Sequence, residues 1–155
     1  NVNGFKWFVE KVLPLIKVDC EIVLVGNHMD LLKDEFKDDN RIIVHGRVED
    51  LSPYYERATL VIGPIFEGAG MKVKTAEALS YGKVFIGTDE SLIGYKELAG
   101  SLLGKSIFVC NNEIEFADAI NSHNFNDEFC QDNYNFFLKN YSIEAATAKF
   151  KTLLE

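Results

Sequence analysis

The stretch Pro64–Lys83, PIFEGAGMKVKTAEALSYGK, contains a small-residue turn that leads into lysines. The turn is made of Gly68, Ala69 and Gly70, and Met71, Lys72 and Lys74 follow it where a helical pattern begins. The start of a helix attracts anions because its first N–H groups are unpaired, and glycine lets the backbone approach a ligand closely. The pattern favours a phosphate site, and the alternative is an ordinary glycine turn with solvated lysines. Neither GxxxxGK[ST] nor GxGxxG is present.

A second candidate is Glu77, an acid set between Ala76 and Ala78 in the same helical stretch. A carboxylate is rarely buried unless it is paired. If Glu77 faces a ligand cleft, it can accept two hydrogen bonds from a vicinal diol such as a ribose. The alternative is an exposed side chain that contacts Lys74 one helical turn earlier.

Two further turns contain polar residues directly after apolar runs. Gly46, Arg47 and Val48 follow the run RIIVHG, and the segment Gly87–Ser91 follows another. Either turn could line the same cleft. Alternatively, the first is a solvated loop and the second is a helix-capping turn. The histidines are scattered and no CxxC pair exists, so we expect no metal site.

Short apolar runs that read as strands alternate with helical segments along the chain. The expected strands are Glu21–Gly26, Arg41–Gly46, Thr59–Pro64, Lys83–Thr88 and Ser106–Asn111. This alternation predicts an α/β fold, a Rossmann-like parallel sheet with helices on both faces, followed by a helical C-terminal tail. Ligands bind beyond the carboxyl ends of the strands in such sheets, which is where the glycine turn falls.

Capping residues predict the helix boundaries. Asn3 is expected to cap a first helix that runs to about Val18, and Gly82 to end the helix that contains Glu77. Four more residues are expected at helix starts: Ser52, Asn112, Asn126 and Ser142. The chain opens almost directly on a helix where a strand is usual, so we expect it to be a piece of a longer polypeptide.

Composition narrows the classes of function. The 155 residues fit one domain, and the net charge of −8 without a basic block argues against a general nucleic-acid binder. No apolar run is long enough to span a membrane, and the N-terminal residues are not a secretory signal. Three widely spaced cysteines indicate free thiols in a reducing, cytoplasmic compartment.

Residues Gly46–Glu90 resemble the nucleotide-sugar-binding domain of the group 1 (family four) glycosyltransferases. The matching elements are a glycine turn after a strand, a helix with a tyrosine pair, a strand ending in Pro64, the GAGMKVK turn, the Glu77-Ala78 pair and a Gly-Thr strand end. With the segments before and after this block, the resemblance covers about residues 3–110. It implies one half of a GT-B fold, in which two Rossmann-like domains hold the active site between them.

The resemblance also implies roles for individual residues. The backbone of Gly46, Arg47 and Val48 would approach the base, and the amides of Gly68, Ala69, Gly70, Met71 and Lys72 would hold the diphosphate. Lys72 and Lys74 would add positive charge, and Glu77 would bind the ribose hydroxyls. Many members have two glutamates with seven residues between them, but here position 69 is alanine and Glu67 is two residues further away. Glu67 would therefore contact the donor sugar or only cap the loop.

The implied function is binding of a UDP- or GDP-sugar, with transfer of the sugar, with retention, to an acceptor glycan or lipid-linked sugar. Residues 1–155 would be a single donor-binding domain, inactive alone, whose first strand and N-terminal acceptor domain lie outside this sequence. The N-terminal domain would be its partner, and could place the enzyme at the inner membrane face. No further cofactor is expected. The alternatives are a nucleotide-sugar epimerase of the same fold and a non-catalytic, flavodoxin-like binding module.

Overall fold

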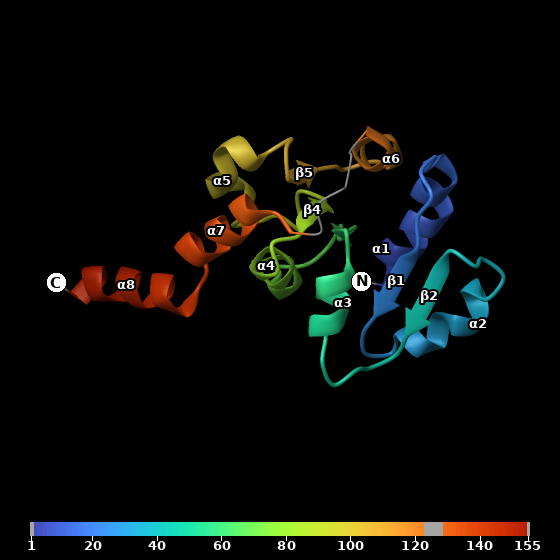
Figure 1. The fold of residues 1–155 in the computed structure, drawn as a ribbon, viewed down its shortest axis with the longest axis horizontal. Helices are drawn as coiled ribbons and strands as arrows, with labels where there is room; N and C mark the ends of the chain where they lie inside the picture. Colours follow the sequence, from blue (N-terminus) through green and yellow to red (C-terminus); the bar gives the residue numbers. More distant parts are fainter. Residues whose placement is uncertain (1, 123–128, 155) are drawn as a thin grey trace.

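The computed structural model describes residues 2–122 and 129–154 as short strands alternating with helices (Figure 1). The strands are β1 Ile22–Val25, β2 Ile42–His45, β3 Leu60–Gly63, β4 Val84–Gly87 and β5 Ile107–Val109. The α-helices are α1 Val2–Trp7, α2 Lys33–Phe36, α3 Ser52–Arg57, α4 Val73–Ser80, α5 Lys96–Ala99, α6 Glu113–Ser122, α7 Gln131–Asn140 and α8 Ile143–Leu154. The shorter helical segments are η1 Phe8–Val12, η2 Leu13–Leu15, η3 Met29–Leu32 and η4 Gly100–Leu102.

All strand pairs are parallel, which confirms the predicted α/β class. The strands form two sheets instead of the single expected one: β1 pairs with β2, and the other sheet has the order β3-β4-β5. Within the described residues, β1 and β3 make no strand pairing with each other. Within each sheet the parallel arrangement brings the carboxyl ends of the strands to one edge, and Gly63 at the end of β3 is in register with Gly87 at the end of β4.

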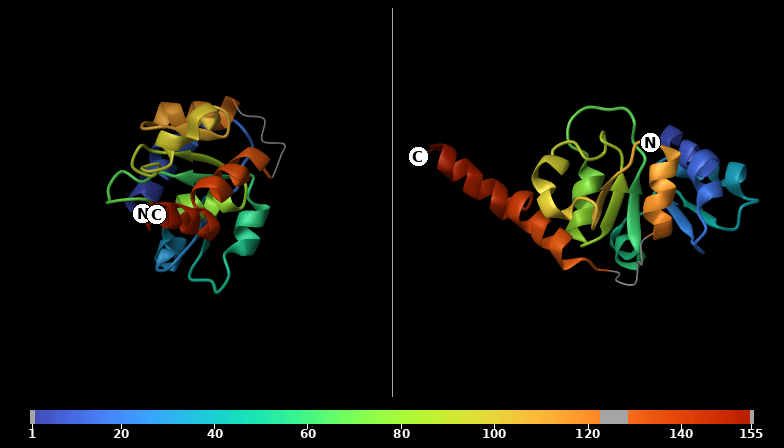
Figure 2. Two further views of the ribbon diagram at one scale, coloured as in Figure 1. Left: turned by 90° about the vertical axis from the view of Figure 1, so that its left-hand side faces the viewer. Right: turned by 90° about the horizontal axis from the view of Figure 1, so that it is seen from above.

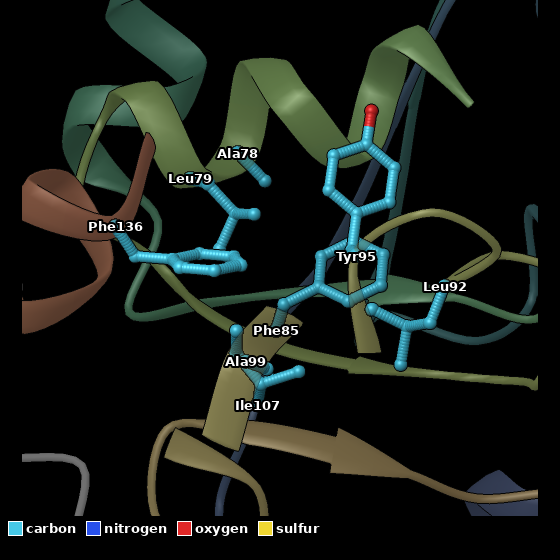
Figure 3. Close-up of a cluster of buried hydrophobic side chains, with 8 residues drawn as sticks. All are labelled: Ala78, Leu79, Phe85, Leu92, Tyr95, Ala99, Ile107 and Phe136. Atoms are coloured by element: carbon cyan, nitrogen blue, oxygen red, sulfur yellow. The ribbon is translucent and has the colours of Figure 1, made fainter. Parts of the chain in front are cut away.

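Alternate residues of β4 point into two different cores, so helices cover both faces of the β3-β4-β5 sheet. On one face, Phe85 lies 2% exposed in a cluster with residues of α4, α5 and α7 (Figure 3). On the other face, Ile86 is fully buried against η1 and α6. β4 is the central strand of this sheet, as its continuous apolar sequence suggests.

The first helical segment connects the two sheets through side-chain packing. Phe8 and Val12 belong to the core that contains Ile86, whereas Phe5 and Leu13 pack with the residues of β2 and η3. The segment covers one face of the β1-β2 sheet. On the other face Val23 is 43% exposed, which is unusual for an apolar residue of a parallel strand.

The N-terminal helix differs from the prediction. Asn3 lies inside α1 and does not cap it, and the helical segment ends at Leu15 instead of about Val18. It widens to a π-helix over Phe8–Val12 and then tightens to a 3₁₀ turn. Pro14 explains the early end, because it has no N–H to donate to the preceding turn.

The other capping predictions have mixed outcomes. Gly82 ends α4 with φ 62°, and Asn112 and Ser142 accept hydrogen bonds at the starts of α6 and α8, as predicted. Ser52 is instead the first residue of α3, and the Asp50 carboxylate accepts its N–H at 2.8 Å. Asn126 lies outside the described residues.

The helical tail has one anchored and one projecting helix. The amide of Asn133 in α7 is fully buried, and it accepts a hydrogen bond from Ser106 Oγ at 2.6 Å and donates to the Lys83 carbonyl at 2.8 Å. α8 extends away from the body of the molecule (Figures 1 and 2), with Ile143 83% and Phe150 66% exposed. Among the described helices, none is long and apolar enough to cross a membrane.

Candidate functional site

The predicted site residues lie in turns that follow parallel strands. Gly46–Val48 follow β2, residues 64–72 follow β3, and residues 88–91 follow β4. Because β3 and β4 are paired in register, the second and third of these turns emerge side by side. This edge is therefore where the sheet can present polar groups to a ligand.

The glycine turn has a backbone that side chains would disfavour. Gly68 and Gly70 have φ values of 145° and 65°, and both are exposed. A Cβ atom at Gly70 would meet nothing within 4 Å, so only the backbone conformation requires glycine there. The turn ends at Lys72, which is the N-cap of α4 and caps it with no side-chain hydrogen bond.

Three contacts hold the base of this turn while its tip stays exposed. The Tyr95 hydroxyl donates to the Lys72 carbonyl at 2.9 Å, and the buried Thr75 hydroxyl donates to the Ser91 carbonyl at 2.7 Å. Thr88 Oγ1 donates to the Ile65 carbonyl. The start of α4 and the turn after β4 are therefore fixed to each other.

Lys72 and Glu90 form an ion pair across the two turns. Lys72 Nζ lies 2.7 Å from Glu90 Oε1 and donates to the Gly70 carbonyl at 2.8 Å. The side chains are only 14% and 22% exposed. A Cβ atom at Gly68 would lie 3.3 Å from Lys72 Nζ and 3.6 Å from Glu90 Oε1, so both charged groups lie over the glycine turn.

Three other residues of the turn, Glu67, Ala69 and Met71, are exposed to solvent, as is Lys74 in the first turn of α4. Met71 is 48% exposed and its side chain lies over Gly94. Among the described residues, Lys74 makes no ion pair. Its positive charge lies in the first turn of α4, where the helix dipole alone would favour an acid.

Glu77 is half-buried in the second turn of α4, and its partner is a tyrosine of α3. The Tyr55 hydroxyl donates to Glu77 Oε2 at 3.1 Å. The Tyr55 ring stacks on Tyr81 with centroids 5.0 Å apart, and the Tyr81 hydroxyl donates to Ser52 Oγ at 2.6 Å. Burial, with the adjacent Glu77 carboxylate, raises the pKa of Tyr55. The alternative ion pair of Glu77 with Lys74 is not formed.

Gly46, Arg47 and Val48 belong to the edge of the other sheet. Gly26 donates its N–H to the Gly46 carbonyl at 3.3 Å, and a Cβ atom at Gly46 would lie 3.2 Å from Asp30 Cβ. Arg47 is exposed. Within the described part of the chain, no hydrogen bond or ion pair joins Gly46–Val48 to the glycine turn.

Metal and thiol chemistry receive no support from the described residues. They contain no group of three or more His, Cys, Asp or Glu side chains placed to hold a metal ion. Cys20, Cys110 and Cys130 are not joined in disulfides, and burial raises the pKa of the Cys110 thiol to about 11. A shallow hollow between Asp19 and Arg41 lies at the opposite ends of β1 and β2, away from the predicted ligand edge.

Two residues at the site were not singled out from the sequence. Tyr55 entered the sequence analysis only as part of the tyrosine pair of a helix, and Glu90 only as part of the polar turn Gly87–Ser91. A half-buried tyrosine usually finds a partner for its hydroxyl, which is a general signal but does not identify that partner. The pairing of Glu90 with Lys72 depends on the register of β3 and β4.

Comparisons with known proteins identify relatives of this chain. The family described as "Glycosyl transferases group 1" matches residues 1–123. An "Uncharacterized 44.6 kDa protein in cps region" of Klebsiella pneumoniae is 27% identical over 156 residues, covering 91% of this chain and 39% of that protein. The chain therefore spans less than half the length of this relative.

Proposed function

Because the chain belongs to the group 1 glycosyltransferase family, we propose that it binds the nucleotide-diphosphate sugar from which such an enzyme transfers a glycosyl group. The observation that carries the proposal is the exposed turn with Gly68 and Gly70 in glycine-favouring conformations, leading through Lys72 into α4. Open backbone amides, a helix start and two lysines at one edge are suited to a diphosphate.

Each predicted residue has a defined task in this proposal. The amides of residues 68–72 bind the diphosphate, with Lys72 and Lys74 adding positive charge. Glu77 Oε1 accepts hydrogen bonds from the ribose hydroxyls, while Oε2 accepts a hydrogen bond from the Tyr55 hydroxyl. The backbone of Gly46–Val48 contacts the base. The donor is a UDP- or GDP-sugar, and the anomeric configuration is retained.

The lysines and amides also have a chemical role. When the bond between sugar and diphosphate breaks, negative charge develops on the leaving diphosphate. Positive groups that are already oriented toward that charge stabilise the transition state more than the ground state. Lys72 is already oriented, because Glu90 and the Gly70 carbonyl fix its ammonium group beside the turn.

We also propose that the chain is the donor half of a two-domain GT-B enzyme. Two surfaces support this view. The separate edges of β1 and β3 would each accept a neighbouring strand, and α8 exposes Ile143 and Phe150 where an N-terminal acceptor domain could pack. The acceptor would be a glycan or a lipid-linked sugar.

The proposal is tested by titration calorimetry of UDP and GDP into the protein expressed from its complete open reading frame. We expect binding of one nucleotide, a strong loss in Lys72→Ala, and a weaker loss in Lys74→Ala. Lys105→Ala, in an exposed turn near the opposite ends of the strands, is the matched control and should bind like wild type. Failure of wild type to bind either nucleotide at millimolar concentration would contradict the proposal.

A further inference from the structure

Glu90 places a negative charge inside the region where the diphosphate is proposed to bind. Its Oε1 atom is 2.7 Å from Lys72 Nζ and would be 3.6 Å from a Cβ atom at Gly68. The contacts of Thr75 with the Ser91 carbonyl and of Thr88 with the Ile65 carbonyl fix the turn that carries Glu90. The backbone that carries Glu90 is therefore held beside the glycine turn.

Fold stability gives no sufficient reason for a carboxylate here. An ion pair that is largely shielded from solvent loses the hydration of both charges, and this cost offsets much of their attraction. The carboxylate also offsets the charge of the cation that a diphosphate needs. Among the described residues Glu90 Oε2 makes no hydrogen bond, so Lys72 holds this carboxylate through Oε1 alone.

The substrate and the product of glycosyl transfer differ in charge at this position. The terminal phosphate of a free nucleoside diphosphate has a second pKa near about 6, so it is close to a dianion at neutral pH. In the nucleotide sugar that phosphate is esterified and carries a single negative charge. A fixed carboxylate close to the terminal phosphate therefore repels the product more than the donor.

We propose that Glu90 is a specificity-determining residue that weakens binding of the nucleoside diphosphate product relative to the nucleotide-sugar donor. The inference rests on the proposed donor site. Glu90 also positions the Lys72 ammonium group, which contacts the phosphate. The Glu90 carboxylate at the same time reduces the net positive charge of the site. Product binding is thereby weakened more than donor binding, which favours product release.

The test compares Glu90→Gln with wild type, using the protein from its complete open reading frame. Glutamine keeps an oxygen acceptor for Lys72 and removes the charge. The ligands are UDP, UDP-glucose and a UDP whose terminal phosphate bears a methyl ester, with the GDP and GDP-mannose set in parallel. The methyl ester carries the same charge as the donor but lacks the transferred sugar. Its affinity therefore distinguishes the effect of charge from the effect of contacts with that sugar.

We expect Glu90→Gln to raise the affinity for the nucleoside diphosphate about three- to tenfold more than the affinity for its sugar or methyl ester, the effect of one extra unit charge about 6 Å away in a solvated site. Product inhibition should strengthen by the same factor. Glu97→Gln on α5 removes an equal charge outside the site and should leave all three affinities unchanged.

Four results would overturn the proposal. Equal changes for all three ligands would show that Glu90 does not distinguish their charges. Weaker binding of the sugar nucleotide alone would show that Glu90 contacts the sugar. Absence of any binding by wild type would remove the donor site itself, and with it this inference, whereas wild-type binding with no effect of Glu90→Gln would remove the inference only.

Discussion

Tyr55→Phe is the sharpest test of how Glu77 is held. The substitution removes only the hydroxyl that donates to Glu77 Oε2 at 3.1 Å. It keeps the ring, which stacks on Tyr81 with an interplanar angle of 8°. The packing of α3 against α4 should therefore persist, and the carboxylate of Glu77 loses its one hydrogen-bond donor among the described residues.

The expected effect follows from the nature of this hydrogen bond. A hydrogen bond to a charged group contributes about 1.5–3 kcal/mol, and the half-buried position of Glu77 favours the lower end. A loss of about 1.5 kcal/mol in the free energy of unfolding corresponds to a fall of about 3–6 °C in Tm for a chain of this size. Because burial raises the pKa of Tyr55, its hydroxyl remains a donor and the effect should be constant from about pH 6 to about pH 9.

Urea denaturation and titration calorimetry measure the two consequences. We expect UDP or GDP to bind about 3- to 10-fold more weakly to Tyr55→Phe, because a mobile carboxylate must be ordered before it meets the ribose. Inorganic pyrophosphate, which has no ribose, should bind as before. Tyr81→Phe keeps the same ring stack and loses only the contact with Ser52 Oγ, so it is the matched control.

A double-mutant cycle that combines Tyr55→Phe with Glu77→Ala can refute the idea that Tyr55 acts through Glu77. If Tyr55 acts through Glu77, the two substitutions should be non-additive for nucleotide binding by about 1 kcal/mol. Additive losses, or an equal loss of pyrophosphate affinity, would show that Tyr55 supports the fold of α4 and does not position the carboxylate.

Three further substitutions test other parts of the structure. Gly70 and Gly104 have φ values of 65° and 76°, and a Cβ atom at either position would meet nothing within 4 Å. Gly70→Ala and Gly104→Ala should therefore each lower the free energy of unfolding by about 1–2 kcal/mol, and only Gly70→Ala should weaken pyrophosphate binding. Equal losses of pyrophosphate affinity would contradict the site. Asn133→Ala removes the buried hydrogen bonds of its amide with Ser106 Oγ and with the carbonyls of Lys83 and Ser106, and should cost about 2–4 kcal/mol in urea denaturation. Asn135→Ala on the exposed face of the same helix should cost less than about 0.5 kcal/mol. Burial raises the pKa of Cys110 from the ordinary thiol value of 9.0 to about 11, so the folded state keeps this proton to a higher pH than the unfolded state does. The free energy of unfolding should therefore fall as the pH rises from about 9 to about 11. Cys110→Ala should flatten that part of the stability curve, and an unchanged slope would contradict the raised pKa.

The sequence predicted the features that depend on local chemistry. Apolar runs such as Val84–Gly87 form strands, and Gly82, Asn112 and Ser142 end or begin helices because their conformations and side chains meet local backbone needs. The turn at Gly68–Gly70 also falls at the strand edge where it was expected. These predictions succeed because each rests on a few neighbouring residues.

Features that depend on tertiary contacts were not predictable in the same way. The partner of Glu77 is Tyr55, 22 positions earlier, and that of Lys72 is Glu90, 18 positions later. Both pairs exist only after helices and strands have packed in one register. The early end of the first helical segment had a local signal in Pro14, but the apolar pattern through Ile16 masked it.

The division into two sheets has a consequence for the cooperativity of unfolding. In a continuous sheet, backbone hydrogen bonds between neighbouring strands couple the unfolding of one strand to that of the next. Here the β1-β2 unit and the β3-β4-β5 unit are connected by side chains of α1, η1 and η2, with Phe5 and Leu13 in one core and Phe8 and Val12 in the other. The two units can therefore have different opening free energies. Amide hydrogens of β1 and β2 should exchange before those of β4, which is enclosed by packed residues on both faces. The side-chain packing between the two units sets how closely the two exchange rates agree.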